Sequence, residues 1–223
     1  MKPGQGWVRA GDFPIDHPRF GTLEPCPVCS SGRLPAYLRK CSRLAGALSE
    51  ARFAKYYDKP GRKVQRDAAQ ALVKEGHGWL TLWGSFGQGK SYLLACVVNA
   101  ALDKNKPAVY TTAADLLDHL RGAYDPQGGP GYSAAFEYWR TAAVLAVDEI
   151  SEYYMTPWAD EKLRQLIGYR YDMRETLTTV FACEVEPAGD LWPGNLGWLA
   201  SRMMHGTVVK AGGGDVRPLM KGK

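Results

Sequence analysis

Residues 84–91 constrain the fold of this chain more than any other stretch. They read Gly-Ser-Phe-Gly-Gln-Gly-Lys-Ser, which fits the pattern G-x-x-x-x-G-K-[ST] of a phosphate-binding loop. An aromatic, strand-favouring run at 79–83 precedes the loop, and an apolar run at 92–102 follows it and is long enough for a buried helix. Strand, glycine-rich loop and helix form the context that such a loop requires, so the sequence predicts a nucleotide-binding site.

The positions of this loop have distinct predicted tasks. Its glycines let backbone N–H groups turn toward phosphate oxygens, and the positive end of the following helix adds to the attraction. Lys90 is expected to reach the β- and γ-phosphates, and the Ser91 hydroxyl is expected to bind Mg²⁺. The predicted ATP-binding residues are Gly84, Ser85, Phe86, Gly87, Gln88, Gly89, Lys90, Ser91 and Tyr92.

A second chemical feature lies at the end of an apolar run. Residues 142–147 are all apolar and lead directly into Asp148 and Glu149. A central strand of a parallel sheet has this pattern, and it presents its last residues at the C-terminal edge of the sheet. We expect Asp148 to hold Mg²⁺, directly or through water, and Glu149 to position and polarise the attacking water.

The rest of the chain alternates between strand and helix patterns. Further strands are expected at 108–111, 176–183 and 207–210. The alternation predicts an α/β fold, a P-loop nucleoside-triphosphatase with a central, mainly parallel sheet flanked by helices, plus a small Cys-containing N-terminal segment. The break at Asp58-Lys59-Pro60-Gly61 divides the chain into an N-terminal segment at 1–58 and an ATPase domain at 59–223.

Three cysteines in the N-terminal segment raise the question of zinc. Cys26 and Cys29 have the spacing of a zinc-binding turn, and Cys41 would be a third ligand. A structural zinc takes four ligands, so His17 or a partner would have to complete the site. The alternative is a remnant that holds no metal.

The composition bounds the location and the partners. The two remaining cysteines lie in apolar runs, as expected in a reducing compartment, and no run is long enough to span a membrane. We therefore expect a cytoplasmic protein with no membrane contact. The net charge is +5, but residues 31–66 carry ten Lys or Arg against two acids, a net charge of +8.

Aromatic residues are interleaved with the charges of residues 31–66. Such a mixture suits single-stranded nucleic acid, because cations bind phosphates and rings stack on bases. The alternative is a solvated helix face with ordinary packing aromatics. Leu44, Leu48 and Ala51 follow helical spacing and predict a helix from about 43 to 57.

Several stretches outside the phosphate loop carry a family resemblance. They are Thr111–Leu117 with Leu120-Arg121, Val147–Glu149, Leu163–Tyr171, and Ser201–Met203 with Gly214–Arg217. The chain resembles the helicase-loader branch of the AAA+ ATPases, which includes the DnaC/DnaI-type loaders and the related IstB transposition helpers. The resemblance runs from about residue 26 to residue 217. The Cys-rich N-terminal segment is similar to loaders that carry a zinc-binding helicase-contact domain, and the short length resembles phage-encoded versions.

The resemblance implies an ATP-hydrolysing homo-oligomer that loads or remodels a replicative helicase on single-stranded DNA. The alternative is an IstB-like helper that binds DNA as an ATP-dependent oligomer beside a transposase. Arg170 matches the position of an arginine finger that enters the neighbouring subunit's ATP site, with Arg174 as the nearby substitute. A cation at the C-terminal end of a helix is the ordinary alternative for Arg170. Arg202 resembles the second sensor arginine, which contacts ATP.

One departure from the family concerns hydrolysis. Related chains end the strand after Arg170 with a polar run such as Thr-Ser-Asn, which senses the γ-phosphate, whereas here Ala182-Cys183-Glu184 occupies that place. A carboxylate near the γ-phosphate is repelled by it. Either Thr179 takes the sensing role, or hydrolysis is slow and binding does most of the switching. A non-enzymatic ATP-binding adaptor and a small-metabolite P-loop kinase are the competing classes. The adjacent carboxylates suit water activation better than transfer to an alcohol.

Overall fold

The computed structural model describes residues 7–9, 14, 23–25, 36, 38–56, 61–122, 130–151, 156–187, 192 and 196–215. Its centre is a five-stranded sheet in the order β4-β5-β6-β3-β7. The strands are β3 (Gly78–Trp83), β4 (Ala108–Thr112), β5 (Val144–Asp148), β6 (Thr178–Cys183) and β7 (Thr207–Lys210). Every neighbouring pair in this sheet is parallel, so the predicted α/β fold with a parallel sheet is confirmed.

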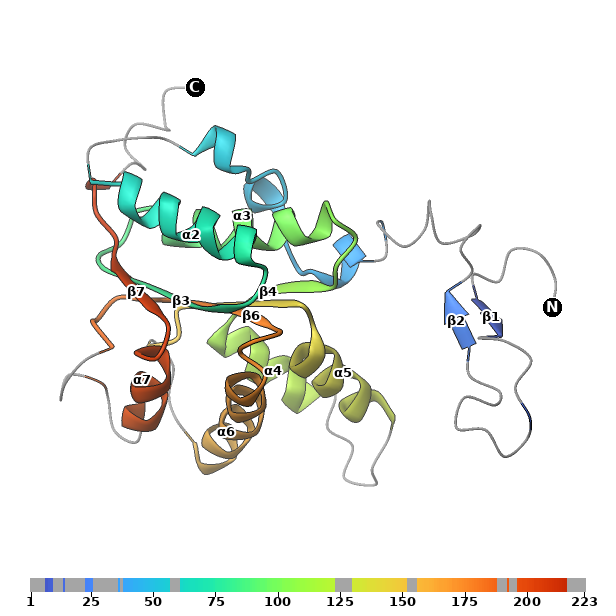
Figure 1. Ribbon diagram of the computed structural model, residues 1–223. Coiled ribbons are helices and arrows are strands. Elements are labelled where there is room, and N and C mark those ends of the chain that lie inside the picture. Colours follow the sequence, from blue (N-terminus) through green and yellow to red (C-terminus); the bar gives the residue numbers. More distant parts are fainter. Residues whose placement is uncertain are drawn as a thin grey trace.

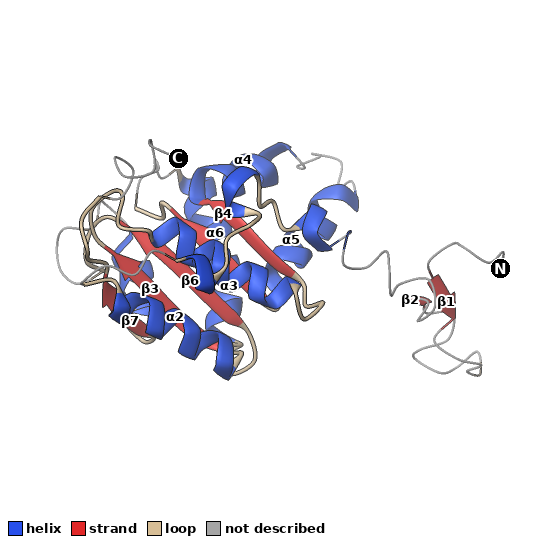
Figure 2. Cartoon of the chain, turned by 90° about the horizontal axis from the view of Figure 1, so that it is seen from above, coloured by secondary structure: helices blue, strands red, loops and turns tan. Residues whose placement is uncertain are grey.

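Helices cover both faces of the sheet (Figure 1). One face carries α2 (Lys63–Glu75) and α3 (Lys90–Leu102), which lie across the strands in the view of Figure 2. The other face carries α4 (Ala113–Gly122), α5 (Pro130–Thr141), α6 (Pro157–Asp172) and α7 (Gly197–Met203). Because both faces are covered, β5 and β6 are buried along their whole length, which explains their continuous apolar sequences.

Two apolar clusters form the core on the two sides of the sheet. Leu93, Leu94 and Val97 of α3 pack with Leu80 and Leu82 of β3 in one cluster. The other cluster joins α4, α5, α6 and α7 to the opposite face of the sheet. No helix among the described residues has the length and apolar character needed to cross a bilayer.

The residues described before α2 contain little regular structure. Strands β1 (Trp7–Arg9) and β2 (Leu23–Pro25) form an antiparallel pair. The expected helix from 43 to 57 is wrong, because the described part of that stretch forms only two short 3₁₀ turns, η1 (Gly46–Leu48) and η2 (Phe53–Lys55). Arg43 and Gly46 have left-handed backbone conformations (φ 61° and 52°), which a continuous helix cannot contain.

Residues 38–56 pack on α3. Leu44, Leu48 and Ala51 lie against Ala95 and Cys96 of α3, which accounts for the helix-like spacing of these apolar residues. The predicted boundary after residue 58 itself falls within 57–60, outside the described residues.

The buried side chain of Asn99 fastens this segment to α3. Its amide donates to the carbonyl oxygens of Leu48 (3.0 Å) and Ala51 (3.1 Å), and its own oxygen accepts a hydrogen bond from Arg39 (3.3 Å). Carbonyl groups in this irregular segment lack the regular partners of a helix or sheet. The polar side chain of Asn99, on an otherwise apolar helix, supplies donors to two of them.

We predict that Asn99→Ala lowers the free energy of unfolding by about 1–3 kcal/mol, because the two hydrogen bonds that join the carbonyls of Leu48 and Ala51 to α3 are lost. Urea unfolding followed by tryptophan fluorescence measures the change, with the exposed Lys104→Ala as the matched control. Equal stability of the two variants would contradict this role for Asn99.

Candidate functional site

The phosphate-binding loop lies between the C-terminal end of β3 and the start of α3. Gly84, Gly87 and Gly89 in this loop all have positive φ angles (139°, 73° and 83°), which side chains rarely allow. The loop borders a cavity of about 310 Å³ that is also lined by Leu48, Asp148 and Glu149. Two stretches predicted separately from the sequence therefore meet at one cavity.

Lys90 is the first residue of α3, and its side chain is almost fully buried. Its ammonium group donates to the backbone carbonyl oxygens of Gly84 and Ser85, the latter at 2.9 Å. The ammonium group therefore lies against the start of the loop, where a lysine can reach phosphate oxygens that the loop holds. Lys90 is placed as the sequence predicts, but its role stays a prediction.

Tyr110 of β4 connects the two residues predicted to hold Mg²⁺. Its hydroxyl donates to a carboxylate oxygen of Asp148 at 2.6 Å and is also hydrogen-bonded to Ser91. Burial, followed by the charge of Asp148, raises the pKa of Tyr110 far above its ordinary value, so the phenol keeps its proton. Ser91 and Asp148 are thus held within one hydrogen-bonded group.

The residues at this point fit a magnesium ion. A serine hydroxyl and a buried carboxylate converge beside the phosphate loop, and oxygen atoms of this kind are the ligands that Mg²⁺ prefers when it is shared with a nucleotide. Asp148 also accepts a hydrogen bond from the backbone N–H of Glu149 (3.0 Å), which fixes the orientation of its carboxylate.

Glu149 lies at the cavity in an unusual backbone conformation. Its φ angle of 53° is left-handed, and such conformations in residues other than glycine cluster at functional sites. Burial raises the pKa of its carboxyl group, and the nearby charges of Asp148, Asp115 and Glu184 raise it further. An elevated pKa suits a general base that takes a proton from water.

The end of β6 lacks the polar run that senses the γ-phosphate in related chains, as the sequence indicates. Ala182 and Cys183 line the cavity, and burial raises the pKa of the Cys183 thiol to about 12, so the thiol remains protonated. One carboxylate oxygen of Glu184 is buried and has no hydrogen-bond partner among the described residues. Thr179 cannot replace the sensor, because it lies near the opposite end of β6 and accepts a hydrogen bond from Arg170.

The structure does not place Arg170 as a finger. Its side chain is fully buried and donates to Thr179 (2.9 Å) and to the carbonyl oxygens of Ala142 (2.9 Å) and Thr178 (2.6 Å). Two further carbonyls, at residues 139 and 140, also accept from it. The guanidinium therefore joins α5 to the starts of β5 and β6, and burial lowers its pKa to about 9. The sequence does not reveal this role of Arg170, because helical spacing carries no information about partners on other elements.

Arg202 also differs from its predicted role. It lies at the end of α7, shortly before β7 begins at Thr207, and the start of β7 pairs with Leu80 near the start of β3. The phosphate loop follows the opposite end of β3. Arg202 is therefore separated from its own chain's phosphate loop by nearly the length of a strand, which does not suit a sensor of that chain's ATP.

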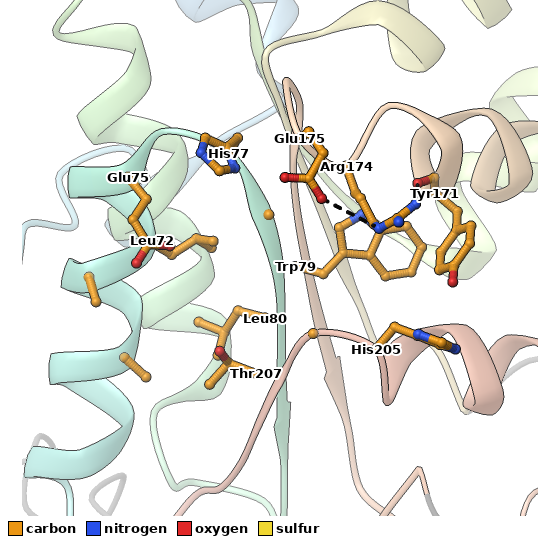
Figure 3. Close-up of a pocket in the computed structure, with 14 residues that line it drawn as sticks. Leu72, Glu75, His77, Trp79, Leu80, Tyr171, Arg174, Glu175, His205 and Thr207 are labelled. Atoms are coloured by element: carbon orange, nitrogen blue, oxygen red, sulfur yellow. Dashed lines mark hydrogen bonds and ion pairs between the residues drawn. The ribbon is translucent and has the colours of Figure 1, made fainter.

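A second cavity, of about 510 Å³, lies at this N-terminal edge of the sheet. Figure 3 shows Leu72 and Glu75 of α2 on one side of it, and Trp79, Arg174 and His205 on the other. Arg202 is close by, because its guanidinium and that of Arg174 both lie over the Tyr171 ring, at 5.6 and 4.7 Å from its centre. Two arginines thus stand together at the edge of the sheet opposite the phosphate loop.

Three of the described cations in the basic stretch at 31–66 are engaged within the chain. Arg39 and Arg52 both form ion pairs with Asp103 (2.5 and 3.3 Å), and Arg62 is fully buried. Tyr56 is buried as well, so its ring is not available to stack on a base. The alternative of ordinary packing aromatics therefore fits Tyr56 better than nucleic-acid binding does.

The predicted zinc ligands Cys26 and Cys29 and the candidate His17 lie outside the described residues, so the structure does not place them. Cys41 is described as a partly buried free thiol. Within the described part of the chain, no group of three or more His, Cys, Asp or Glu residues could hold a metal ion.

Residues 36–184, well over half of the chain, match the family model of IstB-like ATP binding proteins. The chain belongs to this family. The IstB-like chain is also 27% identical over 109 residues to the replicative helicase loader DnaI of Bacillus subtilis (strain 168), an alignment that covers 48% of this chain and 33% of that protein. The chain thus spans about a third of the length of the curated relative it matches.

Solved structures support the fold. The IstB-like chain superimposes on the crystal structure of DnaI with a TM-score of 0.61 and 18% identity, covering 81% of this chain and 99% of that one. For the DnaC helicase loader the TM-score is 0.60 at 18% identity, covering 75% and 100%. Domain III of the replication initiation protein DnaA from Thermotoga maritima gives 0.62 at 19% identity, covering 73% and 67%. The AAA+-type P-loop fold predicted from the sequence is confirmed.

Tyr110 and three residues behind the loop (Tyr56, Arg62 and Gln65) were not predicted as parts of the site. Tyr110 could have been found from the pairing of two apolar runs. Strands β4 and β5 are neighbours, and Thr112 stands opposite Asp148, so the end of β4 that carries Tyr110 lies beside Asp148. For the other three there was no local signal, because they lie 19 or more positions before the phosphate loop and reach it only through the fold.

We predict that Arg170→Met lowers the free energy of unfolding by about 3 kcal/mol or more, because several buried carbonyl groups lose their donor together. Arg174→Met is the matched control, since the Arg174 side chain is 43% exposed and bonds one nearby carbonyl. Chemical denaturation distinguishes the two variants. Wild-type stability of Arg170→Met would show that the side chain is not the anchor described.

Proposed function

We propose that this IstB-like chain is an ATPase that loads or remodels a replicative helicase on single-stranded DNA. The observation that carries the proposal is the convergence of Lys90, Ser91, Asp148 and Glu149 on one cavity beside the phosphate loop. Family membership and the match to the helicase loader DnaI support the biological role. A cytoplasmic location follows from this role and stays a prediction.

The proposed reaction is hydrolysis of ATP to ADP and phosphate. The loop N–H groups and Lys90 hold the β- and γ-phosphates, and Ser91 and Asp148 are the residues that would hold Mg²⁺. When bound, Mg²⁺ offsets the negative charge of the phosphates. Glu149 takes the proton from the water whose oxygen attacks the γ-phosphorus, while the bond from that phosphorus to the β–γ bridging oxygen breaks.

We further propose that Arg202, with Arg174 beside it, acts on the ATP of a neighbouring copy in a homo-oligomer. Both arginines stand at the sheet edge opposite their own phosphate loop. Head-to-tail association would bring this edge of one copy to the nucleotide edge of the next. A finger supplied in trans is worth about 10³- to 10⁵-fold in well-studied phosphoryl-transfer enzymes.

An IstB-like transposition helper is the second candidate. The family match favours it as much as it favours a loader, because the same residues serve both. The discriminating property is the protein partner, a replicative helicase for a loader and a transposase for a helper. Co-purification with each purified candidate partner in the presence of ATP separates the two.

We predict steady-state ATP hydrolysis that rises with single-stranded DNA and disappears in Lys90→Ala. Glu149→Gln should keep ATP binding and lose turnover, because it removes the base without changing the loop. Phosphate-release assays with equilibrium binding measure both properties. Tight binding with no turnover in the wild-type protein would instead indicate an ATP-binding adaptor.

Mixing two inactive variants tests the trans role of Arg202. Arg202→Ala chains keep an intact phosphate loop, and Lys90→Ala chains keep an intact Arg202, so a mixture should recover part of the hydrolysis that each lacks alone. Arg164→Ala is the control, because Arg164 also lies over an aromatic ring, that of Trp198 (4.6 Å), and is exposed. Full activity of Arg202→Ala alone, or no recovery in the mixture, would contradict the proposal.

The pH dependence of hydrolysis should report Glu149. A base works only when ionised, so activity is present above the pKa of Glu149 in the folded protein and is lost as the pH falls through it. Because that pKa is raised in the nucleotide-free protein, the acid limb of kcat/KM should lie above the ordinary range of a glutamic acid. Glu184→Gln removes one negative charge and should move the limb to lower pH, whereas the exposed Glu175→Gln should leave it unchanged. An unmoved limb in Glu184→Gln would contradict this electrostatic coupling.

A further inference from the structure

Two carbonyl groups of the phosphate loop are held from behind by side chains that precede it in the sequence. The carbonyl of Gly87 accepts a hydrogen bond from Arg62 at 2.9 Å. The carbonyl of Gln88 accepts one from Gln65 at 2.8 Å, and the hydroxyl of Tyr56 lies 3.4 Å from the same oxygen. Gln65 also donates to the Tyr56 hydroxyl, so the three side chains form one group, which we call the loop clamp.

The clamp lies outside the lining of the cavity. Its members are 1% (Arg62), 0% (Gln65) and 6% (Tyr56) exposed, and none of them is among the described residues that line the cavity. The Arg62 guanidinium stands over the Tyr56 ring, 5.9 Å from its centre. A side chain at Gly89 would meet both Tyr56 and Arg62 at 3.0–3.2 Å, so this glycine lets the clamp approach the loop closely.

Holding these two carbonyls fixes the direction of the neighbouring N–H groups. A trans peptide unit is planar, and its C=O and N–H bonds point in opposite directions. The carbonyl of Gly87 shares a peptide unit with the N–H of Gln88, and the carbonyl of Gln88 shares one with the N–H of Gly89. Because both carbonyls point toward the clamp, both N–H groups point toward the cavity, where loop N–H groups bind phosphate oxygens.

We propose that Arg62 and Gln65 are positioning residues for nucleotide binding, which set the phosphate-binding N–H groups of Gln88 and Gly89 without touching the nucleotide. The inference deepens the proposed function and rests on it, since it assumes that the loop binds a nucleoside triphosphate. The preferred ligand class is a nucleotide with at least two phosphates, because the affected N–H groups belong to the part of the loop that cradles α- and β-phosphates.

The clamp also connects two distant parts of the chain to the loop. Arg62 donates to the carbonyl of Gly214 at 2.7 Å, and the N–H of Gly212 donates to Gln65 at 2.8 Å. On the other side, Tyr56 belongs to the same N-terminal segment as Leu48, which lines the cavity. The segment before the ATPase sheet and the one after β7 therefore meet at the residues that shape the phosphate loop.

The test compares Arg62→Met with Arg52→Met in the full chain. Arg52 is the control, because its side chain also precedes α2 but pairs with Asp103 and donates to the carbonyls of Ser49 (3.3 Å) and Ala51 (2.9 Å), away from the loop. Calorimetric titration with ATP and with ADP should show a loss of about 10- to 100-fold in affinity for both nucleotides in Arg62→Met, the effect of losing a charged hydrogen bond. Arg52→Met should bind both as the wild type does.

Two readouts separate positioning from a general loss of structure. In ¹⁵N–¹H NMR spectra, Arg62→Met should move the amide signals of Gln88 and Gly89 more than those of the sheet. Arg62→Lys should recover only part of the affinity, because an ammonium group keeps the charge but cannot reproduce the planar guanidinium that stands over the Tyr56 ring and donates to the carbonyls of Gly87 and Gly214. Wild-type affinity in Arg62→Met, or loop amide signals that do not move, would overturn the proposal.

If Arg62→Met does not fold, Gln65→Met tests the same idea through the carbonyl of Gln88, with the same titration and the same outcomes. The result is distinguishable from failure of the proposed function. Wild-type protein that binds no nucleotide would refute the function, whereas wild-type binding combined with unaffected Arg62→Met or Gln65→Met variants would refute only the clamp.

Discussion

A phosphate loop binds phosphate only if its backbone N–H groups face the ligand. The elements around this loop hold it in one conformation. The loop connects β3, which is paired on both sides with parallel strands, to the buried helix α3. Those two elements fix the ends of the loop. Its middle is fixed by Arg62, Gln65 and Tyr56, which hold the carbonyls of Gly87 and Gln88 outward. Tyr56, which precedes the ATPase sheet in the chain, thus contacts the phosphate loop directly.

The parallel sheet determines what meets the nucleotide. Because β5 and β6 run parallel to β3, their C-terminal ends deliver Asp148, Glu149 and Cys183 to the same edge as the loop. That edge gathers carboxylates, since Asp115 and Glu184 also raise the pKa of Glu149. A site with this charge favours a bound cation and disfavours an ionised base at low pH. The arginines Arg174 and Arg202 gather at the opposite edge, which separates the two charges by the length of the strands.

Local sequence was sufficient for the parts of the site that are contiguous in the chain. The loop, its flanking strand and helix, and the strand ending in Asp148 and Glu149 are where the sequence predicted them. The failures all involve long-range contacts. Arg170 occupies the end of a helix in the sequence, but its partners lie on α5 and β6, and the spacing of Leu44, Leu48 and Ala51 arises from packing on α3. The clamp was not predicted because a buried arginine that bonds backbone carbonyls has no sequence pattern.

We propose that residues 44–56 and the phosphate loop contribute to one nucleotide site. Hydrogen–deuterium exchange of the intact chain, with and without Mg²⁺ and ATP, tests this most directly. ATP should slow exchange both in peptides that cover 84–92 and in peptides that cover 44–56, since Leu48 lines the cavity and Tyr56 contacts the loop. Protection confined to 84–92, with no change in 44–56 at saturating ATP, would contradict it.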